Sequence, residues 1–167
     1  MLSTKPSRKY RHHLRSESKQ DTQTPDWLYR WLDRQFPFQL DAAASRRNAR
    51  YFRFYTRHDN GLLQPWYHWT FCNPPFRRIR LWIDKALWEA SLGNGSVLVL
   101  PQALSSEWYR AAYRFCHTWL LNPRFPYKGR PDGVPFGTKV LIFDQETTAI
   151  ASENRIRLVD VRPFISP

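Results

Sequence analysis

The tetrapeptide Asn73-Pro74-Pro75-Phe76 contains groups that could hold an amino group attached to a planar ring. The side-chain carbonyl of Asn73 and the main-chain carbonyl of Pro74 can accept hydrogen bonds from the two amino hydrogens, and Pro75 restricts the backbone before it. Phe76 offers an aromatic face for a base that has left a duplex. An exocyclic amine such as adenine N6 is a poor nucleophile, because its lone pair is delocalised. These residues would therefore act by orientation and electrostatic stabilisation, without a covalent intermediate.

The simpler interpretation of this tetrapeptide is that a proline pair ends a strand, and the surrounding sequence favours chemistry instead. Residues 68–72 predict a strand directly before it, and Arg77 and Arg78 follow it. Residues 79–90 then place apolar side chains at helical spacing, and a Gly-Asn-Gly sequence at 93–95 closes that helix. The tetrapeptide is therefore expected at the carboxyl end of a strand, just before a helix.

A second short motif, Asp41-Ala42-Ala43-Ala44, follows a predicted strand at residues 38–41. Strands that alternate with helices predict an α/β domain with a mainly parallel sheet. In such sheets ligands bind beyond the carboxyl ends of the strands, where both motifs are expected. Further strands are predicted at residues 96–100, 118–121, 138–143 and 156–161, and a helix capped by Ser105 or Ser106 is predicted to run to about residue 115.

The remaining segments carry more local expectations. Thr24-Pro25 predicts a helix start, with Thr24 as the N-cap and Pro25 at the first helical position. Residues 48–52 are expected to be helical, and Asp59 begins a turn with the next two residues, Asn-Gly. Residues 123–137 are rich in proline, glycine and basic residues and predict a loop. Residues 144–167 could add a strand or an oligomer contact.

The charge of the chain favours a polyanionic partner. There are 26 basic and 14 acidic residues, giving a net charge of +12. Six of the basic residues and one acidic residue lie in residues 1–20, which are read as a basic flexible tail, so the rest still carries +7. Nucleic acid is the first candidate partner and an anionic membrane surface the second. Eight Trp, eight Tyr and eleven Phe also provide rings that can stack on bases.

The cysteines and the hydropathy of the chain argue against a metal-binding or membrane-spanning protein. Cys72 and Cys116 lack the spacing of a zinc or redox motif, so no metal site is expected and a reducing cytoplasm fits. No apolar stretch approaches the roughly 20 residues that a membrane-spanning helix needs, and no signal peptide is expected. The length of 167 residues predicts one compact domain, assigned here to residues 21–167.

Taken in order, these motifs resemble the phage-type Dam family of DNA N6-adenine methyltransferases. The similarity covers roughly residues 20 to 143 and rests on the following stretches: Thr24-Pro25, Phe38-Gln39-Leu40-Asp41-Ala42-Ala43-Ala44-Ser45 with Asn48, Tyr55-Thr56, Asp59-Asn60-Gly61-Leu62, Gln64-Pro65-Trp66, Phe71-Cys72-Asn73-Pro74-Pro75-Phe76, Leu100-Pro101, Ser106 and Trp108.

The resemblance implies a Rossmann-like methyltransferase fold with S-adenosylmethionine as the methyl donor. It places Thr24 and Pro25 near the methionine part of the cofactor, and Asp41 with Ala42 near its ammonium group or ribose. Asp59 is either a further cofactor contact or only a turn residue. Two features depart from common methyltransferase patterns: alanines replace the glycine-rich cofactor loop, and Phe76 stands where tyrosine is more common.

The implied substrate is double-stranded DNA, with GATC as the target of the family and protection of a phage genome from host restriction as the setting. The target-recognition loop is expected near residues 122–137. Two alternatives stay open: a binding protein that has lost catalysis, and a methyltransferase for another acceptor such as RNA adenine or cytosine N4. The oligomeric state is left open. The candidate DNA contacts are Arg77, Arg78, Arg80, Lys128 and Arg130.

Overall fold

The computed structural model describes residues 23–128, 136–146 and 156–165. Within these residues, six strands form one sheet in the order β1-β2-β3-β5-β4-β6. Five of the strands run in the same direction, and β5 is antiparallel to both of its neighbours. The strands are β1 (Leu40–Asp41), β2 (Thr70–Cys72), β3 (Ser96–Pro101), β4 (His117–Asn122), β5 (Thr138–Phe143) and β6 (Ile156–Asp160).

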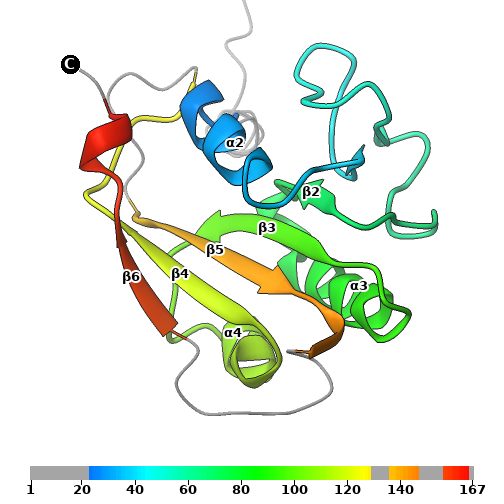
Figure 1. Ribbon diagram of the computed structural model, residues 1–167. Helices are drawn as coiled ribbons and strands as arrows, with labels where there is room; N and C mark the ends of the chain where they lie inside the picture. Colours follow the sequence, from blue (N-terminus) through cyan, green and yellow to red (C-terminus); the bar gives the residue numbers. More distant parts are fainter. Residues whose placement is uncertain (1–22, 129–135, 147–155, 166–167) are drawn as a thin grey trace, which may run out of the picture.

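Helices cover both faces of this sheet (Figure 1). The helix α2 (Asp26–Asp33) packs Leu28 and Leu32 on one face. The helices α3 (Ile79–Ser91) and α4 (Glu107–Ala112) pack on the other. Because both faces are covered, β3 and β5 are buried along almost their whole length and read as apolar runs. This layered, mostly parallel arrangement is compatible with the Rossmann-like α/β fold that the sequence predicts.

Most of the predicted elements are confirmed. The helix expected at residues 79–90 and the strands expected at 96–100, 118–121, 138–143 and 156–161 are present within one or two residues of their predicted ends. The helix expected after Ser106 ends as α4 at Ala112 and continues as a short 3-10 turn, Tyr113–Phe115. The strands at 38–41 and 68–72 are shorter than predicted. The segment after residue 144 adds the edge strand β6, which pairs in parallel with β4.

The helix predicted at residues 48–52 is wrong. The side chain of Asn48 accepts hydrogen bonds from the backbone N–H of Ser45 at 2.6 Å and from its hydroxyl at 2.9 Å, and this closes a turn. Short polar side chains that bond to nearby backbone compete with helix formation in this way. The chain then bends through residues 50–53 and returns to the sheet at Phe54, which forms an isolated parallel bridge with Asp41.

The expectation that Thr24 caps a helix is also wrong. Pro25 is the N-cap of α2 and no side chain caps the helix, whose first turn is closed by a bond from the Tyr29 N–H to the Pro25 carbonyl at 3.1 Å. The Thr24 side chain is buried, and its Oγ1 has no hydrogen-bond partner among the described residues. Proline sets its own backbone for a helix start, so the threonine hydroxyl is not needed there.

Three of the predicted features fall partly or wholly outside the described residues. These are the basic tail at residues 1–20, the middle of the predicted recognition loop at 129–135, and Arg130 within it. Among the helices of the described part, none is long and apolar enough to cross a membrane.

Candidate functional site

The two motifs lie side by side at the carboxyl edge of the sheet. β1 and β2 are parallel neighbours with Asp41 opposite Phe71, and the Ala42 N–H donates to the Phe71 carbonyl at 2.9 Å. The chain leaves β1 through Ala42 and leaves β2 through Asn73, so both exits are on the same edge. The expectation that both motifs lie at the carboxyl ends of neighbouring strands is therefore confirmed.

The segment after β2 is short and rigid. Pro74 is buried and Pro75 is exposed, and Phe76 begins a 3-10 turn (Phe76–Arg78) that leads directly into α3. The ring of Phe76 is half-buried and meets Phe136 edge to face, with 5.6 Å between the ring centroids. Phe136 comes from the end of the predicted recognition loop, so the structure brings this end of the loop against the tetrapeptide.

The Asp41 side chain is almost fully buried and holds the backbone that follows β1. Its carboxylate accepts hydrogen bonds from the N–H groups of Arg50 at 3.0 Å and Ala43 at 3.4 Å. Burial raises the pKa of this carboxyl to about 6, although the two backbone bonds oppose the shift. A carboxylate held in this way fixes the loop after β1 as well as offering charge to a ligand.

Arg50 joins this loop to the start of α2, and sequence reasoning missed it. Its guanidinium forms an ion pair with Asp26 and donates to the main-chain carbonyl of Thr24. It also lies 5.9 Å from the centroid of the Tyr29 ring. The Thr24-Pro25 and Asp41-Ala42 segments are therefore tied together by one side chain. No local pattern in the sequence distinguishes Arg50 from the arginines around it.

The residues around Asp41 suit a polar, partly charged cofactor. Thr24 carries a buried hydroxyl oxygen that lacks a partner among the described residues, and such an atom is normally satisfied by a ligand or water. The buried carboxylate of Asp41 can pair with an ammonium or a ribose hydroxyl. Among the residues described, no three His, Cys, Asp or Glu side chains are grouped so that they could hold a metal ion.

Gly61 packs directly on Ala42. A Cβ atom at Gly61 would overlap the Ala42 carbonyl oxygen, so this approach requires glycine. The Gly61 carbonyl in turn accepts a hydrogen bond from the indole N–H of Trp66 at 2.9 Å. The backbone at Ala42 is therefore supported by the loop that contains Gly61.

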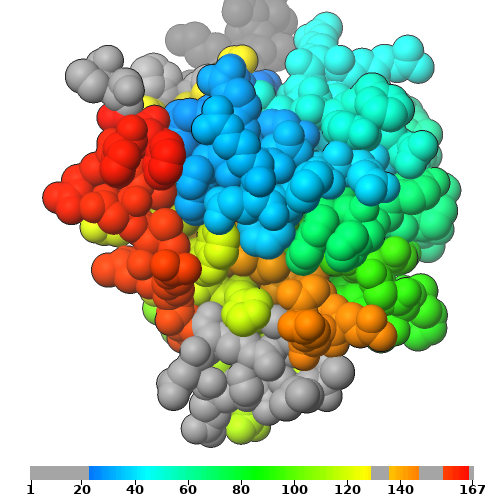
Figure 2. All heavy atoms as spheres, viewed as in Figure 1, coloured from blue at the N-terminus to red at the C-terminus, as the bar shows by residue number. Residues whose placement is uncertain are grey.

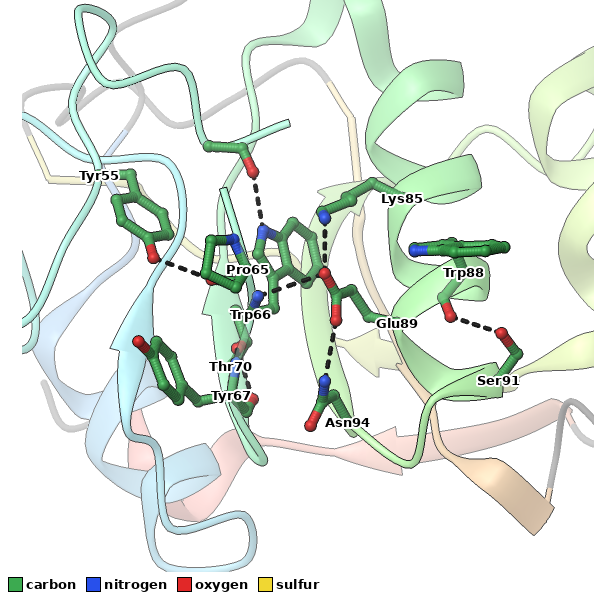
Figure 3. A network of polar contacts seen from close by, with 11 residues as sticks. Tyr55, Pro65, Trp66, Tyr67, Thr70, Lys85, Trp88, Glu89, Ser91 and Asn94 are labelled. Carbon is green, nitrogen blue, oxygen red and sulfur yellow. Dashed lines mark hydrogen bonds and ion pairs between the residues drawn. The ribbon is translucent and has the colours of Figure 1, made fainter. Parts of the chain in front are cut away.

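A buried glutamate fixes this supporting loop (Figure 3). The Glu89 carboxylate on α3 accepts hydrogen bonds from the main-chain N–H of Trp66 at 3.2 Å and from the Asn94 side chain at 2.9 Å. It also forms an ion pair with Lys85. The Tyr55 hydroxyl donates to the Pro65 carbonyl at 2.8 Å from the other side. Glu89 was missed at the sequence level. The signal for it was a charged residue at a position of α3 that its apolar spacing marks as buried.

The structure places Asp59 in a turn. Its carboxylate is exposed and accepts from the N–H of Thr56 at 2.8 Å and from its hydroxyl at 2.6 Å. These bonds lower the pKa of Asp59. The predicted turn is present, with Asn60 at a positive φ of 54°. A direct contact between Asp59 and a cofactor stays a prediction.

The predicted DNA-binding residues differ in how far they are already engaged. Arg77 and Arg78 lie in the 3-10 turn beside the tetrapeptide and are exposed. Arg80 pairs with Asp84 on α3 at 2.9 Å. Lys128 lies 3.5 Å from an oxygen of Asp26, and its N–H bonds to the Gln23 carbonyl, so it sits at the start of α2.

Comparison with known proteins agrees with this geometry. A family model described as DNA N-6-adenine-methyltransferase (Dam) matches residues 11–149. This range covers the start of α2, both motifs and the strands β1 to β5. Among curated proteins, none matches the chain.

Proposed function

Because the chain belongs to the Dam family of DNA N6-adenine methyltransferases, and is therefore an adenine-specific DNA methyltransferase, we propose the following mechanism. The enzyme transfers a methyl group from S-adenosylmethionine to the N6 amino group of an adenine flipped out of duplex DNA, which would release S-adenosylhomocysteine and the proton that the methyl group replaces on N6. The observation that carries the proposal is the adjacency of Asn73 and Asp41 at one sheet edge.

Asn73 and Pro74 orient the amino group. Each carbonyl oxygen accepts one amino hydrogen, which draws the nitrogen lone pair out of the ring and toward the methyl donor. Pro75 holds the Pro74 carbonyl in place, and the Phe76 ring stacks on the flipped base. No side chain of the tetrapeptide is a strong base, so its contribution is orientation and electrostatic stabilisation.

S-adenosylmethionine supplies an electrophilic methyl group when it is bound. We assign its binding to Thr24, Pro25, Asp41 and Ala42, supported by the unpartnered Thr24 hydroxyl and the buried Asp41 carboxylate. Asp59 joins this set less directly, since its carboxylate already accepts from Thr56. The main contribution of Asp59 is to stabilise the turn after which Gly61 packs against the Ala42 carbonyl.

Duplex DNA then lies across the carboxyl edge of the sheet. The proposed contacts are Arg77 and Arg78 next to the tetrapeptide, Arg80 after release from Asp84, and Lys128 and Arg130 in the recognition loop at 122–137. The proposed target sequence is GATC, and residues 21–167 form the methyltransferase domain. The proposed setting is a phage-encoded enzyme that protects its DNA from restriction in the bacterial cytoplasm, with residues 1–20 as a basic tail.

The test is incubation of the protein with unmethylated duplex DNA and S-adenosylmethionine labelled in its methyl group, followed by nucleoside analysis. Label in N6-methyladenine is the expected result. Two duplexes of equal composition, one with GATC and one with its bases permuted, test the target sequence. Cofactor binding without transfer to any duplex DNA would contradict the mechanism. Equal transfer to both would contradict the GATC proposal alone.

A further inference from the structure

The loop that follows β1 carries an unusual run of positive charge. Between Ala42 and His58 there are five arginines and no acidic residue. Arg50 is turned inward to Asp26, and Arg53 lies 4.4 Å from the centroid of the Tyr67 ring. The three remaining arginines are exposed, and in the part of the chain that the structure describes no carboxylate pairs with them; they are Arg46, Arg47 and Arg57.

Two tight turns hold these arginines at their tips. In the first turn, Asn48 accepts from both the N–H and the hydroxyl of Ser45, which places Arg46 and Arg47 outside. In the second turn, Asp59 accepts in the same way from Thr56, which places Arg57 outside. The Asp59 carboxylate bonds to Thr56, and among the described residues it forms no ion pair with Arg57.

The two turns leave the sheet at the same place. Ala44 precedes the first turn and Tyr55 precedes the second, and the Ala44 N–H donates to the Tyr55 carbonyl at 2.9 Å. Both turns therefore extend from the carboxyl end of β1, the same edge at which Asn73 leaves β2. The segment stands away from the sheet in Figure 1 and forms an outer face of the molecule in Figure 2, coloured cyan in both.

We infer that Arg46, Arg47 and Arg57 form a phosphate-binding surface that holds the DNA backbone beside the catalytic tetrapeptide. Guanidinium groups bind phosphate oxygens with two parallel hydrogen bonds, and three like charges without carboxylates are best stabilised by a polyanion. An exposed ring, Phe52 with 78% of its surface accessible, lies in the same segment, as is common where proteins bind nucleic acid. This inference rests on the proposed function, because it concerns the same DNA substrate.

Unlike two of the DNA contacts proposed above, the arginines of this surface have no carboxylate partner among the described residues. Arg80 and Lys128 each have a carboxylate partner within the protein, at 2.9 and 3.5 Å, so a phosphate must compete with it. Arg46, Arg47 and Arg57 are already exposed and held at the ends of short turns. They are therefore expected to supply a large share of the binding that does not depend on base sequence.

The test is the triple variant R46Q/R47Q/R57Q, assayed by fluorescence anisotropy with a labelled duplex over a range of salt concentrations. The dissociation constant is expected to rise about tenfold or more at low salt, equally for duplexes with and without the target sequence. The slope of log Kd against log salt should fall by roughly 2 to 3, since each phosphate contact contributes about 0.9. S-adenosylmethionine binding, measured by calorimetry, should stay unchanged and shows that the variant is folded.

A matched control removes three exposed arginines from the opposite edge of the sheet: R34Q/R114Q/R157Q. It has the same net charge as the test variant, and its salt slope should equal that of the unmodified protein. Equal slopes for all three proteins would overturn the inference while leaving methyl transfer intact. The proposed function would fail separately if the unmodified protein transferred no methyl group to DNA while the triple variant still showed the lower salt slope.

Discussion

The loops that follow β1 and β2 meet at one sheet edge but are built in opposite ways. The connection after β2 needs only Asn73, Pro74 and Pro75 before helical structure resumes at Phe76. The connection after β1 runs from Ala42 to Trp69 with no helix or extended ladder of its own. Prolines fix the short loop locally. The long loop has local turns as well, but it also depends on hydrogen bonds from distant residues such as Glu89. The proposed catalytic residues are therefore less sensitive to substitutions elsewhere in the chain than the proposed cofactor-binding residues.

The largest expected effect comes from the short loop. Asn73→Ala should lower the rate of methyl transfer by about 10²- to 10³-fold, because one preorganised acceptor for the amino group is lost. Single-turnover transfer with saturating cofactor and DNA measures this rate. The melting temperature and DNA affinity should change little, since Pro74 and Pro75 by themselves restrict the backbone here. A near-normal rate would contradict the mechanism.

The next effect tests whether the long loop depends on remote support. Glu89→Ala leaves the Trp66 N–H and the Lys85 ammonium without their buried partner. The expected loss is about 3 kcal/mol in the free energy of unfolding, measured with urea. The KM for S-adenosylmethionine should rise more than kcat falls, because Gly61 then no longer supports Ala42 firmly.

The matched control for Glu89 lies on the same helix. Asp84→Ala removes an exposed partner of Arg80, and its effect on unfolding should stay within about 0.5 kcal/mol. A KM for the cofactor that is the same in the Glu89 variant and in this control would show that the long loop keeps its shape without support from α3.

A smaller effect is expected at the start of the long loop. Asp41→Ala removes the acceptor for the Arg50 and Ala43 N–H groups and should weaken S-adenosylmethionine binding by roughly 10- to 100-fold, an effect of about 2 kcal/mol. Isothermal calorimetry measures it. Asp41→Asn keeps one acceptor oxygen and should fall between the two proteins. Unchanged affinity in Asp41→Ala would remove Asp41 from the cofactor site.

The smallest effect extends the comparison to the loop after β3. Lys139 on β5 is fully buried, donates to the Ala103 carbonyl at 3.2 Å and lies 3.6 Å from the Tyr109 ring centroid. Burial lowers the pKa of Lys139 to about 7, against 10.5 for the free side chain. Burial therefore favours the neutral form of Lys139 in the folded protein. The free energy of unfolding should rise as the pH rises from about 7 to 10.5, and this gain should be lost again as the pH falls to 7.

Lys139→Met should abolish this dependence. At pH 7 the variant is expected to be more stable than the unmodified protein, because an apolar side chain of similar length replaces an amine whose charged form is disfavoured by burial. Urea unfolding at pH 7 and pH 9.5 measures both effects. The same pH dependence in the two proteins would show that Lys139 keeps its charge in the fold, supported by the aromatic rings.

The parts of the fold that could be predicted are those whose cause is local. β3, β5 and α3 are long apolar patterns with a single period, and their bounds were found within a residue or two. The helix wrongly predicted at 48–52 and the cap wrongly assigned to Thr24 failed for different reasons. The Asn48 side chain bonds to Ser45 and closes a turn, which the sequence does not distinguish from a helix start. Pro25 is itself the N-cap of α2, so the Thr24 hydroxyl is not used as a cap.

The candidate site divides in the same manner. The sequence by itself determined which groups are available for the chemistry, namely an amide, two prolines and an aromatic ring after a strand, because the bonds that constrain them join adjacent residues. Only the tertiary structure decided that Arg50 holds Asp26, 24 residues away, and that Glu89 holds Trp66, 23 residues away. Contacts at such separations depend on how the helices pack on the sheet, and no local pattern encodes that packing.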